Sequence, residues 1–446
     1  MGIKRRIPYS KLLFCFVAFS VSVLYIQTIV DKKSNDLCNE KHTMHIKEPP
    51  AVIYYAVNCS NKLPITEPHD SNETDHEVKL AEDLHSHKKM QKTSKTIQTT
   101  KHRPKVYTFA EFKQKAQTDN FFLSKILTQS YLHSKSYHVL RRYFTGKSYS
   151  FKSEFKNVSI QHNYDINTDV MVFLHIQKTG GMHFNDRLIR ELSYPFKCKC
   201  VFKQPTCPCF NPKGNIWIYT SKLSGWPCGL HADWTQLHRC IPNQIDQMEQ
   251  KRRYRRYFYF TQLRDPIARY MSEYYHQSFY GGHWQDALLG CSNGMAEWLD
   301  VRPCFLSETW QGVGIDEFID CKYNLATNRM TRMLADLTVA DCYVDYINRN
   351  VMRKRAYLWL ESAKHNLQQM EYFGIMENRE WSDALFSSVF QMGFKKIRKS
   401  DVRSKSAEIR LTEDQFLKLL KLVELDIHLY LFATDLFQNR IRNLHI

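Results

Sequence analysis

An apolar run that breaks into a basic, glycine-containing loop constrains this chain more than any other segment. Val170 to Leu174 are β-branched, aromatic and aliphatic, which is typical of a buried parallel strand. Lys178-Thr-Gly-Gly181 follows, and apolar residues from Phe184 to Leu192 recur at helical spacing. Unpaired N–H groups at a helix N-terminus, paired glycines and a lysine suit an anion, so the loop predicts a phosphate or sulfate site. An ordinary strand-to-helix turn with a solvated lysine is the alternative.

The N-terminus predicts a membrane anchor. Residues 1–11 are rich in Lys and Arg, and residues 12–30 contain no charged side chain over a length that spans a bilayer as a helix. A cleaved signal peptide is the alternative, but its apolar core would be shorter and end in small residues. The basic cluster favours a cytosolic tail at 1–11, an anchor at 12–30 and a luminal remainder. This is the type II topology of a single-pass Golgi membrane protein.

Glycosylation sequons agree with a luminal remainder. Asn-x-Ser/Thr occurs at Asn58, Asn72 and Asn157, all after the anchor and all in stretches with an exposed composition. Because sequons also occur by chance, they support the compartment without establishing it.

Cysteine usage also indicates an oxidising compartment. Ten of the 13 cysteines lie from Cys198 to Cys342, and such a compartment would pair many of them. Zinc is the alternative, since Cys198-Lys-Cys200 and Cys207-Pro-Cys209 bring four thiols close together. Cys-x-Cys spacing is tight for one tetrahedral ion, so we favour disulfides, with a pairing that the spacing does not reveal.

The formal charge of +18 predicts an anionic partner. Nucleic acid is absent from the lumen, so a sulfated or carboxylated polysaccharide is the natural candidate. A merely basic, soluble surface is the alternative.

The remaining pattern divides the chain into a stem and a head. Residues 31–148 are expected to form a luminal stem, polar at first and ending in a helical neck over 106–144. Residues 149–446 are long enough for one single-core α/β domain. Further helices are expected over 325–337, over 351–370 and after Thr412, which begins a capping-box pattern.

A second strand-to-helix unit lies at 256–278. Arg256 to Leu263 reads as a buried strand, and Asp265-Pro266 suits the start of a helix that runs to about Ser278. Arg264 follows this strand and Ser272 lies two turns into the helix. In a parallel sheet this edge and the Lys178 loop face one crevice, which suits a nucleotide phosphorylated at two places. The alternative for Arg264 is an ion pair with a neighbouring carboxylate.

His231 is a candidate general base. It stands in Trp226-Pro-Cys-Gly-Leu-His231-Ala-Asp233, an aromatic segment with a cysteine. An imidazole can accept a hydroxyl proton near neutral pH. A structural histidine is the alternative.

A series of short blocks runs through the head in a fixed order. The blocks are His175-Ile-Gln-Lys-Thr-Gly-Gly181, Gly225-Trp226, Cys228-Gly-Leu-His231-Ala-Asp-Trp234, Leu263-Arg-Asp-Pro266, Arg269-Tyr270, Ser272-Glu273, Tyr323-Asn-Leu-Ala326, Asn328-Arg329 and Arg332-Met-Leu-Ala-Asp-Leu337. In these blocks the chain resembles the heparan sulfate 6-O-sulfotransferase family. The resemblance implies an α/β, P-loop-like sulfotransferase fold with a central parallel sheet flanked by helices. It also implies sulfuryl transfer from 3′-phosphoadenosine 5′-phosphosulfate to the 6-hydroxyl of glucosamine in heparan sulfate chains of proteoglycans, without a metal.

The resemblance also implies roles for individual residues. His231 would take the proton from the attacking hydroxyl, Lys178 would neutralise the leaving oxygen, and Arg264 and Ser272 would hold the 3′-phosphate. The loop around the 5′-phosphosulfate would consist of His175, Ile176, Gln177, Lys178, Thr179, Gly180, Gly181, Met182 and His183.

The resemblance also implies acceptor contacts from Trp226, His276 and Trp284, each of which could instead be a core residue. The chain departs from the family at Met182-His183, where members have two threonines, and at Pro205-Thr206, where members have paired lysines that Lys203 could replace. Ser404 and Lys405 lie in a basic segment in place of a family loop that closes over the nucleotide, and a solvated charge run is the alternative there.

Two other functions stay open on the sequence. One is a sulfotransferase that acts on another position or another glycan. The other is a non-catalytic heparan-binding module, against which the presence of Lys178, His231, Arg264 and Ser272 argues.

Overall fold

A computed structural model describes residues 104–128, 134–147, 149–155, 163–193, 198, 206–229, 231–282, 290–291, 294–295, 304, 309–343, 349–395 and 404–444. The expected anchor, most of the stem, the three sequons, Lys203 and Trp284 lie outside these residues. No helix within the described ranges is both long and apolar enough to cross a membrane.

A four-stranded parallel sheet forms the centre of the fold. Its strands are β2 (Val170–Leu174), β3 (Ile218–Tyr219), β4 (Tyr257–Leu263) and β7 (Tyr372–Ile375), in the order β3-β2-β4-β7. All five residues of β2 are buried, as the apolar run predicts. Because β2 lies between β3 and β4, the strand order reverses there, and the carboxyl ends of β2 and β4 are neighbours.

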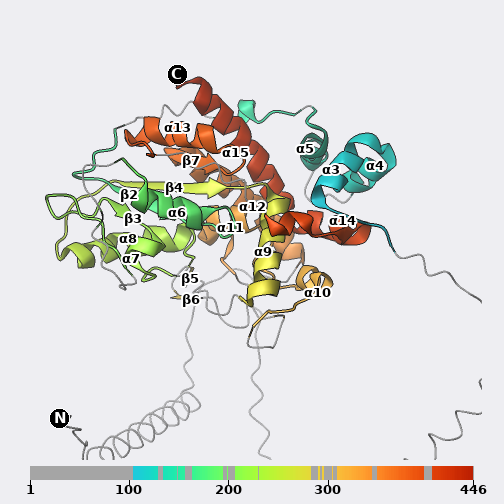
Figure 1. Ribbon diagram of the computed structural model, residues 1–446, viewed down its shortest axis with the longest axis horizontal. Helices are drawn as coiled ribbons and strands as arrows, with labels where there is room; N and C mark the ends of the chain where they lie inside the picture. Colours follow the sequence, from blue (N-terminus) through green and yellow to red (C-terminus); the bar gives the residue numbers. More distant parts are fainter. Residues whose placement is uncertain are drawn as a thin grey trace, which may run out of the picture. The chain divides into compact units, whose positions relative to one another are not determined.

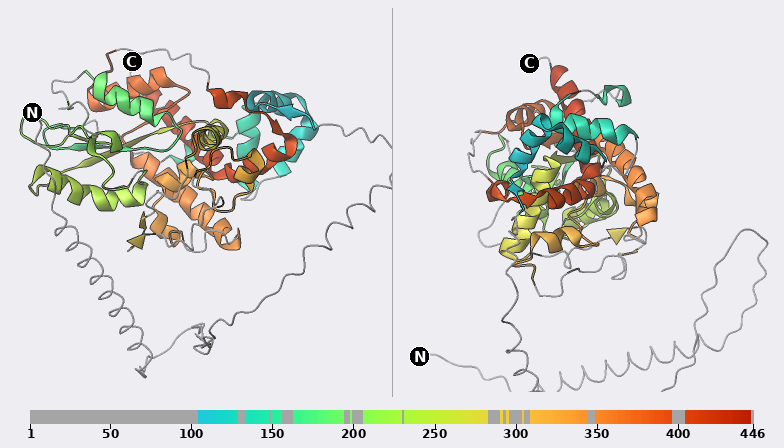
Figure 2. Two further views of the ribbon diagram at one scale, coloured as in Figure 1. Left: turned by 60° about the horizontal axis from the view of Figure 1, so that its bottom comes forward. Right: turned by 90° about the vertical axis from the view of Figure 1, so that its right-hand side faces the viewer.

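Helices cover both faces of the sheet. Figures 1 and 2 show α6 (Gly181–Arg190) and α13 (Arg379–Phe390) together on one face, and α8 (Trp234–Glu249) on the other. Successive side chains of β4 point to opposite faces of the pleated sheet, so adjacent residues pack against the two helix layers. The Phe260 ring lies 6.2 Å from Phe184 and from Phe386, whereas the Tyr259 ring stacks 3.9 Å from His238 of α8.

The other elements surround this core. They are α7 (Ser221–Ser224), α9 (Pro266–Tyr280), α10 (Ile315–Asp320), α11 (Arg329–Leu334), α12 (Arg349–Gln369), α14 (Glu413–Leu422) and α15 (Glu424–Arg442), the short 3₁₀ helices η1 (Lys152–Glu154), η2 (Leu337–Ala340) and η3 (Lys405–Glu408), and a small antiparallel pair, β5 (Gly290–Cys291) and β6 (Gly294–Met295). Helix α12 packs against α11 and α15.

The expected helical neck is present and packs on the C-terminal helices. It contains β1 (Val106–Tyr107), α3 (Phe109–Thr118), α4 (Asn120–Thr128) and α5 (Ser134–Thr145). Phe112 stacks on Phe416 of α14 with ring centroids 4.0 Å apart, and β1 pairs with β8 (Leu411–Thr412). Residues 99–446 therefore form one compact unit that includes both the neck and the head. The boundary at residue 148, expected from the sequence pattern, does not separate two compact units.

Most element boundaries follow local sequence signals. The Asp265 carboxylate accepts from Ala268 N at 3.0 Å and caps α9, as expected, and Thr412 caps α14 through a capping box. The helix expected over 325–337 is shorter, because α11 ends at Leu334 and Asp336 caps a separate turn, η2.

Disulfides bind the loops of the head together. The pairs are Cys198–Cys209, Cys228–Cys240, Cys291–Cys342 and Cys304–Cys321, and Cys207 is also disulfide-bonded. The expectation of disulfides is confirmed, and the zinc alternative is wrong for the three described thiols of the two Cys-x-Cys pairs. Cys228–Cys240 ties the segment before His231 to helix α8.

Candidate functional site

The loop between β2 and α6 is tightly packed. Gly180 is the N-cap of α6 with φ of 85°, a left-handed conformation that glycine adopts without strain. A Cβ on Gly181 would overlap Cδ2 and Nε2 of His175, so the ring and the glycine backbone are in close contact. The buried Thr179 hydroxyl donates to Ile176 O at 2.9 Å and closes the turn. The first N–H groups of α6 are thereby fixed at the carboxyl edge of the sheet, where an anion binds favourably.

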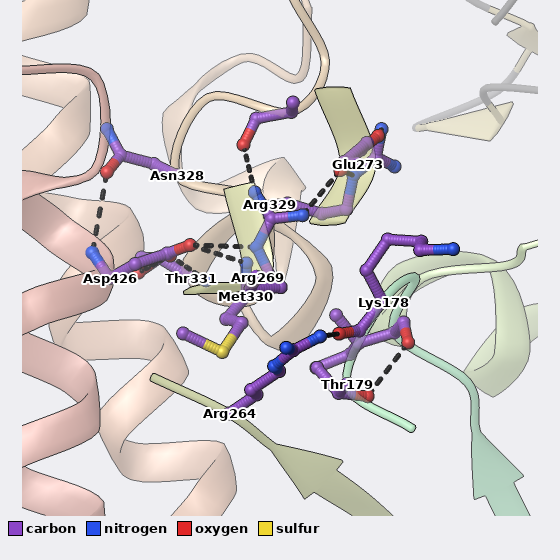
Figure 3. Close-up of polar contacts among 12 residues, drawn as sticks. Lys178, Thr179, Arg264, Arg269, Glu273, Asn328, Arg329, Met330, Thr331 and Asp426 are labelled. Carbon is purple, nitrogen blue, oxygen red and sulfur yellow. Dashed lines mark hydrogen bonds and ion pairs between the residues drawn. The ribbon is translucent and has the colours of Figure 1, made fainter. Parts of the chain in front are cut away.

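Lys178 has a strained backbone and is held by Arg264. Its φ of 66° lies in the left-handed region, which costs a lysine on the order of 1 kcal/mol or more. Arg264, directly after β4, donates from Nη1 to Lys178 O at 3.0 Å. The structure thus brings the two expected anion-binding segments into direct contact. Figure 3 shows this bond and the Lys178 ammonium, which extends away from it.

Burial makes both the Lys178 ammonium and the Arg264 guanidinium costly to keep charged, although nearby carboxylates oppose this effect. Burial lowers the pKa of Lys178, and Arg264 and Arg269 act in the same direction while Glu273 opposes them. Burial also lowers the pKa of Arg264. Cations that are costly to keep charged would be stabilised by a bound anion.

Two histidines face each other beside the loop. The rings of His175 and His231 are 5.2 Å apart, nearly edge to face. Burial lowers the pKa of His231 to about 3, and the positive charges of His175 and Arg329 contribute. Burial and Lys178 lower the pKa of His175 to about 4. Both imidazoles are therefore neutral near pH 7, and a neutral imidazole can accept a proton.

A buried ion cluster lies next to Lys178 and Arg264 (Figure 3). Glu273 of α9 accepts from Arg329 at 3.0 and 2.5 Å and also pairs with Arg269. Asp426 of α15 accepts from Thr331 N at 2.8 Å and from Thr331 Oγ1 at 2.9 Å. The two guanidiniums lower the pKa of Glu273 to about 2 against the effect of its burial. The cluster thereby fixes α9 to α11 and α15.

The remaining nucleotide candidates are distributed around α9 and α6. Ser272 is half-buried on α9, and η3, which follows Ser404 and begins with the exposed Lys405, packs against α9. Ser404 Oγ shares a 2.6 Å hydrogen bond with Ser406 Oγ. Met182 and His183 are both exposed in the first turn of α6.

Two acceptor candidates lie in the described residues. Trp226 is largely exposed in the turn after α7. His276 is half-buried on α9, where burial and the positive charge of Lys178 lower its pKa. Neither side chain is a core residue.

Comparison with known proteins identifies the family of this fold. The sequence model of the Sulfotransferase family matches residues 162–433. "Heparan-sulfate 6-O-sulfotransferase 1-B" of Danio rerio is 37% identical over 280 residues, which cover 62% of this chain and 68% of that protein. "Heparan-sulfate 6-O-sulfotransferase 1" of Homo sapiens is 39% identical over 276 residues, 61% and 66% of the two chains. "Heparan-sulfate 6-O-sulfotransferase 2" of Gallus gallus is 38% identical over 279 residues, 61% and 68% of the two chains.

The chain belongs to the heparan-sulfate 6-O-sulfotransferase family. The sulfotransferase match begins after the neck helices, although α5 contacts the candidate site. Tyr143 of α5 donates to Asp265 Oδ2 at 2.7 Å, and Asp265 N donates to Glu377 Oε1 at 2.9 Å. The turn that carries Arg264 is thus held by α5, which precedes the matched region, and by Glu377, which lies within it.

Sequence reasoning missed several supporting residues of this sulfotransferase. Arg269, Arg329 and Asp426 all stood in segments that resemble the family, but the sequence pattern assigned no role to any of them. A charged residue at a buried helical position is the signal that could have identified them, because such charges require partners. The identity of those partners required the fold.

Proposed function

We propose that this chain transfers a sulfuryl group from 3′-phosphoadenosine 5′-phosphosulfate to the 6-hydroxyl of glucosamine in heparan sulfate. The observation that carries the proposal is the hydrogen bond from Arg264 to Lys178 O, because it places two cationic segments on neighbouring strand ends. A donor with a 5′-phosphosulfate and a 3′-phosphate presents two anionic groups to such a pair. The names of the relatives supply the acceptor and the position of transfer.

The residues present fit this donor. Because Gly181 has no side chain, the His175 ring packs directly against its backbone at the start of α6. We assign the 5′-phosphosulfate to the loop from His175 through His183, and the 3′-phosphate to Arg264 and Ser272, with Ser404 and Lys405 nearby on the η3 side of α9. The donor, when bound, supplies the sulfuryl group and an adenosine bisphosphate that leaves.

In the proposed mechanism His231 is the general base. Its neutral imidazole takes the proton of the attacking hydroxyl, and the proposal places that hydroxyl in line with the sulfur. A bound anion beside His231 would raise its pKa from about 3 towards the working pH. Lys178 neutralises the charge that develops on the leaving oxygen. Trp226 and His276, with Trp284 and Lys203 outside the described residues, are proposed to hold the acceptor.

We further propose that the enzyme is a type II protein of the Golgi membrane. The supporting observations are the uncharged run at 12–30 after a basic tail and the disulfides of the head, which an oxidising compartment favours. Residues 31–103 would form the luminal stem, with glycans at Asn58, Asn72 and, in the head, Asn157.

The first test measures transfer directly. The purified full-length chain is incubated with the donor and a heparan sulfate that lacks 6-O-sulfate, and the product is analysed as disaccharides. New sulfate on glucosamine O6 supports the proposal. Sulfate on another atom contradicts the position but keeps the reaction, and no transfer by donor-binding protein contradicts the activity.

A second test addresses the base. His231→Ala is expected to abolish transfer while donor binding, measured as a rise in melting temperature, remains. His365→Ala is the matched control, since His365 is exposed on helix α12. Transfer at the wild-type rate by His231→Ala would refute the assignment.

A further inference from the structure

Aromatic side chains gather at the C-terminal end of α9. The group, which we name the aromatic ridge, consists of Tyr275, His276, Phe279 and Tyr280. Phe279 is 55% exposed and Tyr280 is 65% exposed, although both are large side chains. Exposed aromatic groups of this kind commonly mark binding surfaces.

The ridge is fixed by contacts among its own rings. Tyr275 stacks on Phe279 with centroids 5.3 Å apart and an interplanar angle of 10°. Tyr280 meets Phe279 edge to face at 4.9 Å and lies 5.4 Å from His276. Rings that are already held in place lose little further side-chain entropy when a ligand covers them.

The ridge continues directly from the candidate site. Figure 1 shows α9 leaving the end of β4 and running towards α10. Ser272, His276 and Tyr280 are spaced by four residues and share one face of α9, which extends about 12 Å from the nucleotide side to the ridge. Burial and the positive charge of Lys178 lower the pKa of His276, which agrees with a position of the near end of the ridge towards the loop.

We propose that the aromatic ridge is a subsite for the acceptor polysaccharide, where pyranose rings beyond the reacting sugar lie against Tyr275, Phe279 and Tyr280. This inference rests on the proposed function. A pyranose has an apolar C–H face and a rim of hydroxyl groups, which match the ring faces and the polar atoms of tyrosine and histidine. A polymer that continues past the reacting sugar must lie on a surface next to the site. Contacts between the polymer and that surface provide binding energy that helps to orient the reacting sugar.

The test compares acceptors of different length. Phe279→Ala and Tyr280→Ala, singly and together, are assayed as full-length protein with a short and a long heparan oligosaccharide lacking 6-O-sulfate. We expect each single variant to raise KM for the long acceptor about tenfold, as for the loss of one interface anchor, with kcat unchanged. The short acceptor, which does not reach the ridge, is expected to keep its KM.

Tyr254→Ala is the matched control. Tyr254 is 87% exposed and precedes the amino end of β4, so it lies at the opposite edge of the sheet from Arg264. The melting temperature of each variant, with and without the donor, reports folding and nucleotide binding. Equal KM values for the long acceptor in variants and wild type would overturn the subsite.

Loss of donor-induced stabilisation would also overturn it, because the ridge would then hold the adenine ring of the nucleotide. Direct calorimetric binding of the long oligosaccharide separates this inference from the proposed function. If the wild type transfers no sulfate, the proposed function fails. The subsite is then tested by binding alone: it is supported if the variants bind the oligosaccharide about tenfold more weakly than the wild type, and overturned if they bind it equally well.

Discussion

Replacing Tyr143 by Phe tests whether the neck helices position the donor site. The Tyr143 hydroxyl donates to Asp265 Oδ2 at 2.7 Å, and both side chains are buried. Asp265 Oδ1 accepts from Ala268 N at 3.0 Å and caps α9. The substitution leaves the ring and its packing in place and removes only the donor to Oδ2.

The expected magnitude follows from the loss of a buried hydrogen bond to a carboxylate, about 2 kcal/mol of unfolding free energy. For a unit of this size that corresponds to a fall of about 3 °C in melting temperature. Because Arg264 immediately precedes Asp265, a loosened cap should also shift the guanidinium away from Lys178 O. We therefore expect KM for the donor to rise about tenfold, equivalent to about 1.4 kcal/mol, with a smaller change in kcat.

The assay combines thermal unfolding of the full-length chain with donor-dependent kinetics. Tyr137→Phe is the control, because Tyr137 lies on the same helix and is 41% exposed. A Tyr143→Phe protein with unchanged melting temperature would refute the assigned strength of the bond. A lowered melting temperature with unchanged KM for the donor would refute the coupling of the neck to Arg264.

Three further changes test the site. The free energy of unfolding should fall from pH 6.5 to pH 5 by about 1 to 2 kcal/mol for each of His175 and His231. The reason is that their pKa values are lowered in the folded chain, so the unfolded chain binds protons that the folded chain does not. A melting temperature that does not change with pH would contradict this. Gly181→Ala should cost about 1–3 kcal/mol and abolish donor-induced stabilisation, since the new methyl group overlaps His175, whereas Gly314→Ala, where a Cβ meets nothing within 4 Å, should leave donor-induced stabilisation intact. Glu273→Gln should destabilise the chain by about 3–5 kcal/mol, as expected for a broken buried ion pair, and a melting temperature equal to that of the wild type would exclude this role.

The sequence predicts the elements that follow local rules. The buried run at Val170 to Leu174, the Asp265 cap with Pro266, and the capping box at Thr412 are each complete within a few residues, and the structure has the corresponding elements. The contact between the Lys178 loop and Arg264 could also be expected, because parallel strands place their carboxyl ends together.

Features that depend on distant pairing could not be predicted in this way. The two-residue strand β3 and the four-residue β7 are too short for a periodic signal. The positive φ of Lys178 is uncommon for a lysine, so the residue type does not predict it. The bond from Tyr143 to Asp265 joins residues 122 positions apart, and only the assembled fold reveals it.

The packing of the neck on α14 has a consequence for biosynthesis. Lys115 and Glu413, joined by an ion pair, are separated by 298 residues. At usual translation rates the ribosome needs roughly 15 to 60 s to make that length. During this interval the apolar faces of α3 and α4, including Phe112 and Phe122, have no α14 to cover them. Nascent chains of this enzyme should therefore engage chaperones through their first helices, and release from them should depend on completion of the last ones.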